Sequence, residues 1–197
     1  MKTLNEIGLL TKTDKANAPD HGHGYLDFYE KFLAPLRNVR INLLEIGIGG
    51  YKYEDKGGES LRMWREYFTH GTIIGVDIHP KSPKIAPECF IIQGSQNDPF
   101  VYVNILSSFG EMDVIIDDAS HNSALSIDTF HAAFALLKPG GIYIWEDTHT
   151  SLWAGEYGGN PKPLAPATSL HFLSRLNALK NEPGNGITLP NDLAEFL

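Results

Sequence analysis

Short apolar runs that end at glycine or acidic residues alternate with longer segments in which apolar residues recur every three or four positions. The short runs are typical of buried parallel strands, and the longer segments are typical of helices that cover a sheet. Strands are predicted at residues 41–47, 72–78, 89–94, 112–117 and 141–146. Helices are predicted at residues 25–36, 60–68, 99–109, 123–137 and 168–180. Residues 1–24 are polar and turn-rich, and no helix or strand is predicted there.

This alternation predicts an α/β fold with a doubly wound, mostly parallel sheet. The chain has 197 residues, of which 42% are hydrophobic, and this length suits one domain. In such sheets ligands bind outside the carboxyl ends of the strands. The residues that follow each strand are therefore the first candidates for a functional site.

Composition narrows the class of partner. The net charge of −8 argues against nucleic acid or an anionic membrane as the partner. No run of about 18 apolar residues is present and the N-terminus lacks a cleavage pattern, so neither a transmembrane helix nor a signal peptide is expected. The single cysteine, Cys89, excludes an internal disulfide and fits a reducing, cytoplasmic compartment. A small molecule is the expected partner.

A glycine-rich turn follows the first predicted strand. Glu45 lies inside this strand, Gly47 ends it and Gly49 follows, so the backbone can approach a ligand closely there. Asp77 ends the second strand, where an acidic residue commonly binds ribose hydroxyls. Both a dinucleotide and S-adenosylmethionine fit this pattern. The third glycine of the dinucleotide pattern G-x-G-x-x-G is absent, and Glu45 suits a ligand that carries an ammonium group.

Four carboxylates end the fourth and fifth predicted strands. Asp117 and Asp118 follow one strand, and Glu146 and Asp147 follow its neighbour, about 4.8 Å away in a sheet. So much negative charge needs a cation or hydrogen-bond donors, and oxygen ligands suit Mg²⁺ or Mn²⁺. His121 lies one turn beyond Asp118 and can act as a base beside the metal. The alternative is that Asp118 caps a helix at a solvated acidic edge.

The chain resembles the class I S-adenosylmethionine-dependent methyltransferases over about residues 11–153. More narrowly, it is similar to the metal-dependent sugar O-methyltransferases of macrolide and related glycosylated natural-product pathways. The resemblance rests on the segments TDK and HGY, followed in order by LLEIGIGGY, GGESLRMW, GVDIHPKS, QGSQNDP, IIDDASH and GGIYIWEDT. It implies Mg²⁺ on Asp118, Glu146 and Asp147, with His121 as the general base. It implies a cofactor site formed by Glu45, Gly47, Gly49, Tyr51, Asp77, Ser95, Gln96 and Asp117.

The function that the resemblance implies is Mg²⁺-dependent transfer of a methyl group from S-adenosylmethionine to a hydroxyl of a sugar or glycosylated small molecule. Residues 1–36 are expected to form a lid, residues 37–153 the cofactor-binding core, and residues 154–197 the acceptor side. The strand pair that normally ends this Rossmann-like methyltransferase fold is not recognisable after residue 152, so a homo-oligomer that covers the open sheet edge is expected. Two alternatives remain, an NAD-dependent oxidoreductase and a non-catalytic cofactor-binding subunit of a methyltransferase.

Overall fold

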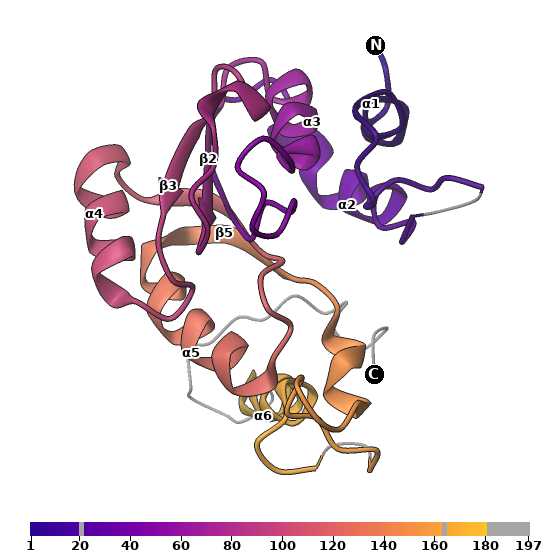
Figure 1. Ribbon diagram of the computed structural model, residues 1–197, viewed down its shortest axis with the longest axis vertical. Helices are drawn as coiled ribbons and strands as arrows, with labels where there is room; N and C mark the ends of the chain where they lie inside the picture. The colour runs from indigo at the N-terminus through magenta and orange to yellow at the C-terminus, as the bar shows by residue number, and fades with distance from the viewer. Residues whose placement is uncertain (20–21, 163–164, 181–197) are drawn as a thin grey trace.

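The computed structural model describes residues 1–19, 22–162 and 165–180 (Figure 1). The strands are β1 (Asn42–Ile46), β2 (Thr72–Asp77), β3 (Phe90–Gln93), β4 (Met112–Asp117) and β5 (Leu137–Trp145). The helices are α1 (Leu4–Thr11), α2 (Leu26–Leu33), α3 (Glu59–Tyr67), α4 (Pro99–Phe109), α5 (Ser123–Ala133) and α6 (Ser169–Lys180). The described residues also contain four short 3₁₀ helices: η1 (Ala34–Leu36), η2 (Pro83–Ile85), η3 (Phe134–Leu136) and η4 (Thr148–Leu152).

The five strands form one parallel sheet in the order β3-β2-β1-β4-β5. The chain runs outward from β1 to β3 on one side, then returns to β4 on the other side of β1. The strand order therefore reverses between β1 and β4, which is where doubly wound sheets bind ligands. Ile46 at the end of β1 lies opposite Val76 of β2 and Asp117 of β4. The predicted fold class is confirmed.

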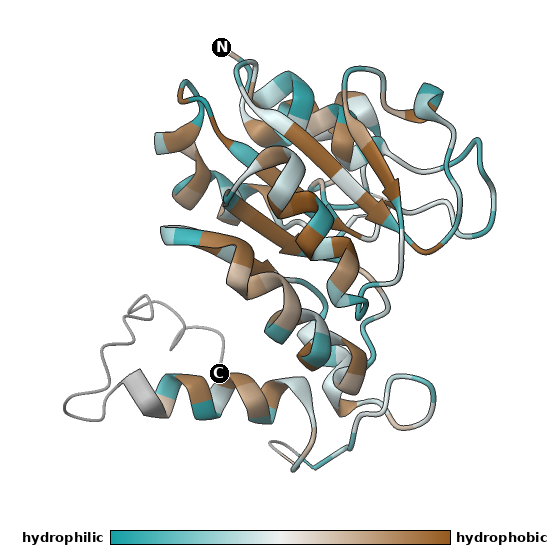
Figure 2. Cartoon of the chain, turned by 90° about the vertical axis from the view of Figure 1, so that its left-hand side faces the viewer, coloured by the Kyte–Doolittle hydropathy of each residue, from teal (hydrophilic) through white to brown (hydrophobic). Residues whose placement is uncertain are grey.

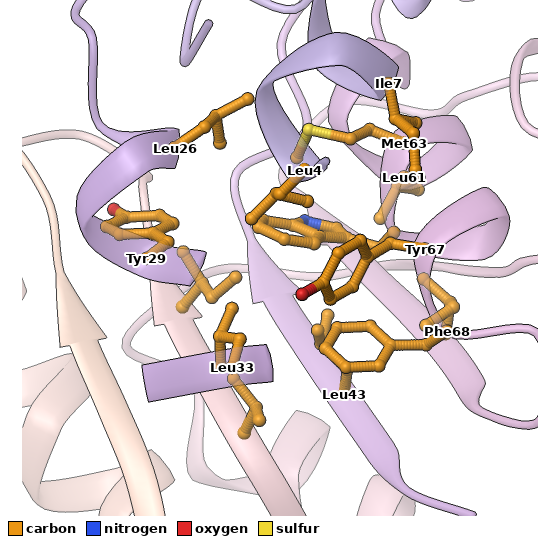
Figure 3. Close-up of a cluster of buried hydrophobic side chains, with 14 of the residues drawn as sticks. Leu4, Ile7, Leu26, Tyr29, Leu33, Leu43, Leu61, Met63, Tyr67 and Phe68 are labelled. Atoms are coloured by element: carbon orange, nitrogen blue, oxygen red, sulfur yellow. The ribbon is translucent and has the colours of Figure 1, made fainter. Parts of the chain in front are cut away.

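Alternate residues of the central strands face two separate hydrophobic clusters. Leu43 of β1 and Ile116 of β4 lie in the cluster that includes residues of α1, α2 and α3 (Figure 3). Leu44 and Ile115 lie in the cluster shared with α4 and α5. The strands are largely hydrophobic in Figure 2, as expected for a sheet that is covered on both faces. The molecule therefore has three layers, helix, sheet and helix.

Helix α1 lies where no helix was predicted, so that part of the sequence interpretation was wrong. Thr3 caps it, because its hydroxyl accepts the Glu6 amide while the Glu6 carboxylate accepts the Thr3 amide. Leu4 and Ile7 of α1 are fully buried in the same cluster as β1. Residues 1–36 thus contribute to the common core, and their role as a lid stays a prediction.

The boundary between α5 and β5 also differs from the prediction. Helix α5 ends at Ala133, and β5 begins at Leu137, so the segment expected to stop the helix already belongs to the strand. The register shifts between Met112 and Val114 of β4, which accommodates this early start. Pro139 is tolerated because it lies at the register shift of the edge strand β5, where residues 138–141 have no paired residue in β4.

The segment after β5 contains α6, as predicted for residues 168–180, and α6 packs on α5 and η4. Residues 181–197, where the end of the chain was expected to lack a strand pair, lie outside the described residues. Within the described ranges no strand follows β5, and the expected homo-oligomer stays a prediction. None of the helices in these ranges has the length and apolar character needed to cross a bilayer.

Candidate functional site

The glycine turn after β1 is built from residues in the left-handed region. The φ angles of Gly47, Gly49 and Gly50 are 85°, 73° and 74°. A Cβ at Gly47 would lie 2.1 Å from the carbonyl oxygen of Asp118, so only glycine fits at this crossing. A Cβ at Gly49 would meet only the Cα of Gly57, at 3.8 Å. The turn therefore presents bare backbone at the reversal point of the sheet.

Asp77 holds this turn against the end of β2. Asp77 is 9% exposed, and its carboxylate accepts hydrogen bonds from the amides of Ile48, at 3.3 Å, and His79, at 2.8 Å. Each carboxylate oxygen can accept more than one hydrogen bond, so these contacts leave room for ribose hydroxyls. Ribose binding by Asp77 stays a prediction.

Gln96 joins the turn after β3 to the turn after β4. Its side-chain oxygen accepts the Ser120 amide at 3.1 Å, and its side-chain nitrogen donates to the Thr129 hydroxyl at 2.9 Å. Ser95 donates to the Asn97 side chain at 2.7 Å. Gln96 and Ser95 therefore lie at the carboxyl edge of the sheet, as predicted, with their cofactor contacts untested.

Tyr51 follows the glycine turn with φ 46° and is 85% exposed. Its carbonyl accepts the Lys81 ammonium at 2.5 Å, and the same ammonium donates to the Tyr53 carbonyl at 3.2 Å. The loop backbone is thus anchored while the Tyr51 ring projects into solvent. The predicted role of this ring over a cofactor stays a prediction.

Glu45 is fully buried and already has partners within the protein. One carboxylate oxygen accepts the Ser60 hydroxyl at 2.8 Å and the Trp64 indole N–H at 3.1 Å. Burial raises the pKa of Glu45 to about 7, although Lys15 opposes this shift. The Lys15 ammonium lies 3.4 Å from the other oxygen, so the ammonium group predicted for a ligand is supplied here by the chain itself. Contact between Glu45 and a cofactor stays a prediction.

Lys15 is the main residue that the site prediction missed. Its side chain is 1% exposed, and its ammonium donates to Asp118 and, at 2.9 Å, to Glu146. Burial alone lowers the pKa of Lys15, but the carboxylates of Glu146, Asp118 and Glu45 outweigh it and hold the pKa well above the usual value. The carboxylate cluster therefore contains a permanent internal cation. In the sequence, Lys15 belongs to the TDK segment, one of the segments on which the family resemblance rests.

Asp118, His121 and Asp147 each bring one ligand atom within 4.8 Å of the others. His121 Nε2 lies 3.7 Å from Asp118 Oδ1 and 3.5 Å from Asp147 Oδ2. Glu146 faces Lys15 with Oε2, whereas its buried Oε1 lacks a hydrogen-bond partner among the described residues. Hard oxygen donors and one unsatisfied buried oxygen fit a divalent cation such as Mg²⁺. Two of the three predicted ligands, Asp118 and Asp147, therefore lie close to the predicted base, His121. The third, Glu146, is linked to Asp118 because both accept hydrogen bonds from Lys15.

The backbone is strained at two of these residues. His121 and Asp147 have φ angles of 55° and 52°, in the left-handed region that side chains other than glycine seldom adopt. The hydroxyl of Thr150, a residue that was not predicted, lies 2.8 Å from both of their carbonyl oxygens. Such strain costs about 1–3 kcal/mol per residue and is concentrated at functional sites. The geometry therefore supports a function for His121 and Asp147 beyond packing.

Asp117, predicted to contact the cofactor, is expected to make stability depend on pH. It is 2% exposed, and burial raises its pKa to about 7 against the opposing backbone amide of Ala119. Between about pH 4 and pH 7 the folded state holds a proton that the unfolded state has released, so the free energy of unfolding falls as pH rises. Asp117→Asn is expected to flatten this slope by up to about 1.4 kcal/mol per pH unit.

Urea unfolding of the metal-free protein at several pH values measures this slope. Asp128→Asn, on the exposed side of α5, is the matched control and is expected to leave the slope unchanged. A full slope in Asp117→Asn would show that another group holds the proton.

Known proteins match both the sequence and the fold. The chain is 39% identical over 176 residues to the demethylmacrocin O-methyltransferase of Streptomyces fradiae. This match covers 88% of this chain and 43% of that enzyme. The chain is also 40% identical over 154 residues to the 8-demethyl-8-alpha-L-rhamnosyl tetracenomycin-C 2'-O-methyltransferase of Streptomyces olivaceus. That match covers 78% of this chain and 40% of that enzyme. No family model matches the chain.

Among solved structures, the MycE methyltransferase of the mycinamycin pathway, in complex with Mg, SAH and mycinamycin VI, matches with a TM-score of 0.84. The two chains are 34% identical, and the match covers 93% of this chain and 50% of that one. The chain thus spans half or less of the length of these relatives. The chain is therefore a relative of the sugar O-methyltransferases of macrolide and tetracenomycin pathways, and it has the fold of class I S-adenosylmethionine-dependent methyltransferases.

Proposed function

We propose that this protein transfers a methyl group from S-adenosylmethionine to a hydroxyl of a sugar on a glycosylated small molecule, in the presence of Mg²⁺. The observation that carries the proposal is the group formed by Asp118, His121 and Asp147, next to the glycine turn at the reversal point of the sheet. The relatives named above support the reaction class, and the MycE complex supports Mg²⁺ and the cofactor.

Asp118, Glu146 and Asp147 are the residues that would hold Mg²⁺. A divalent cation at these carboxylates would lower the pKa of an acceptor hydroxyl beside it. Oδ1 of Asp118 and Oδ2 of Asp147 also lie 3.7 and 3.5 Å from His121 Nε2, so the imidazole is next to the same carboxylates. The chain thus supplies both a place for the cation and a partner for a transferred proton.

His121 is the proposed general base. Its side chain is 24% exposed, so its ring remains accessible to an acceptor. His121 would accept the proton of the acceptor hydroxyl, and S-adenosylmethionine, when bound, would supply the methyl group. The same position also allows His121 to be a metal ligand, and the two roles differ in what loss of the ring does to metal affinity.

His121→Ala is expected to lower the methyl-transfer rate by at least about 100-fold, because the acceptor loses its base. The affinities for Mg²⁺ and for S-adenosylhomocysteine are expected to stay unchanged in calorimetric titrations. His70→Ala, an exposed histidine in the loop after α3, is the matched control. Unchanged turnover in His121→Ala would show that His121 is not the general base. A loss of Mg²⁺ affinity would instead indicate that His121 is a metal ligand.

The function itself is tested with the whole chain, S-adenosylmethionine, Mg²⁺ and glycosylated macrolides whose sugars carry free hydroxyls. Mass spectrometry is expected to detect an added methyl group on the sugar. Thermal stabilisation by NAD rather than by S-adenosylmethionine would favour the oxidoreductase alternative. Cofactor and Mg²⁺ binding without turnover on any acceptor would favour the non-catalytic subunit. The homo-oligomer and the cytoplasmic location stay predictions.

A further inference from the structure

Lys15 and Tyr25 reach the carboxylate cluster from one short stretch of backbone. The Tyr25 amide donates to the Lys15 carbonyl at 3.0 Å, and the Gly24 amide donates to the Ala16 carbonyl at 3.3 Å. These hydrogen bonds hold Lys15 and the start of α2 side by side. Side chains from both positions therefore arrive together at the ends of β4 and β5.

Each of the three predicted metal ligands has one oxygen engaged by this stretch. Lys15 donates to Asp118 Oδ2 and Glu146 Oε2, and the Tyr25 hydroxyl donates to Asp147 Oδ1. The second oxygen of Glu146 has no hydrogen-bond partner among the described residues. The second oxygens of Asp118 and Asp147 are the ones that lie nearest His121 Nε2.

The packing of Tyr25 suits its hydroxyl to act as a hydrogen-bond donor to Asp147. It is half-buried, and its ring stacks between His23, at 5.1 Å, and Tyr29, at 6.1 Å between centroids. The Tyr25 hydroxyl donates to Asp147 Oδ1 from this packed ring. The donor is neutral, so its removal changes the orientation of Asp147 without changing the charge of the site.

We propose that Tyr25 is a positioning residue, whose hydroxyl holds Asp147 Oδ1 so that Asp147 Oδ2 is presented to a divalent cation beside His121. The proposal rests on the proposed function, because that function supplies the cation. A hydrogen-bond partner behind a ligating carboxylate fixes its orientation, and its loss typically lowers metal affinity by about 10- to 100-fold. Lys15 also engages one oxygen each of Asp118 and Glu146, but its positive charge opposes a second cation, so only the neutral Tyr25 hydroxyl tests orientation alone.

The test is Mn²⁺ binding to the full chain, followed by electron paramagnetic resonance of the free ion. Tyr25→Phe keeps the stacked ring and removes only the hydroxyl, and it is expected to weaken Mn²⁺ binding about tenfold or more. The matched control is Tyr67→Phe, because the Tyr67 hydroxyl also donates to a carboxylate, that of Glu30 at 3.4 Å, on the α2 and α3 side of the core. The control is expected to bind Mn²⁺ as the unsubstituted chain does.

Calorimetric binding of S-adenosylhomocysteine accompanies each titration and is expected to be unchanged in Tyr25→Phe. Equal Mn²⁺ affinities in Tyr25→Phe and the unsubstituted chain would overturn the role of Tyr25 and leave the proposed function standing. Equal losses in Tyr25→Phe and Tyr67→Phe would also overturn it, because the effect would then be a general loss of stability. An unsubstituted chain that binds no Mn²⁺ would overturn both the role of Tyr25 and the metal requirement of the proposed function.

Discussion

Replacement of Lys15 with methionine is expected to lower the free energy of unfolding by about 3–5 kcal/mol in metal-free buffer, the usual cost of removing one partner of a buried ion pair. The ammonium of Lys15 contacts Glu45, Asp118 and Glu146, and the side chains of Glu45 and Glu146 are 0% and 2% exposed. Without Lys15 these carboxylates repel one another in a site that water barely reaches. Urea unfolding at neutral pH measures the change.

Lys2→Met is the control for this substitution, since the Lys2–Glu66 pair is exposed and such pairs contribute about 0–1 kcal/mol. Saturating Mg²⁺ is expected to stabilise Lys15→Met more than the unsubstituted chain, because the uncompensated carboxylates attract the ion more strongly. A loss below about 1 kcal/mol would contradict the prediction and would show that protonation of the carboxylates replaces the lysine.

Exhaustive chelation of divalent cations is expected to lower methyl transfer by about a thousandfold or more, since a metal ion contributes several kcal/mol to such reactions. Binding of S-adenosylhomocysteine is expected to persist, because the metal ion is proposed to serve the acceptor hydroxyl and not the cofactor. Radiolabelled methyl transfer and calorimetry measure the two effects separately.

Asp147→Asn is expected to reproduce the effect of chelation, and Asp128→Asn, on the exposed side of α5, is its control. Readdition of Mg²⁺ or Mn²⁺ is expected to restore turnover of the unsubstituted chain. Turnover that survives chelation would refute the metal assignment. Loss of S-adenosylhomocysteine binding on chelation would instead place the ion at the cofactor.

The sheet could be predicted from the sequence because each strand is a short apolar run bounded by polar residues. Helix α1 was not predicted because only Leu4 and Ile7 of its apolar residues are buried, which gives a weak helical pattern. Its capping box lies in a segment that is otherwise polar. The start of β5 was missed because Lys138, Pro139 and Gly140 usually stop a helix, whereas an edge strand also tolerates them.

The acidic part of the site was predictable because strand order alone brings Asp118 and Asp147 to one edge of the sheet. Lys15 and Tyr25 could not be placed in the same way, since no periodic pattern reports contacts over 103 and 122 positions. The burial of Lys15 also contradicts the usual preference of lysine for the surface. Only the TDK and HGY segments pointed to these two residues.

The Lys15–Glu146 contact joins residues 131 positions apart, about three quarters of the length of the described chain. During synthesis Lys15 leaves the ribosome first, and Glu146 follows only after all the preceding strands have emerged. Lys15 must therefore wait for this partner until β5 can pair with β4, even though α1 can already pack on α2 and α3. The functional site is thus among the last parts of the molecule that can form, and completion of the sheet and completion of the site are one event in folding.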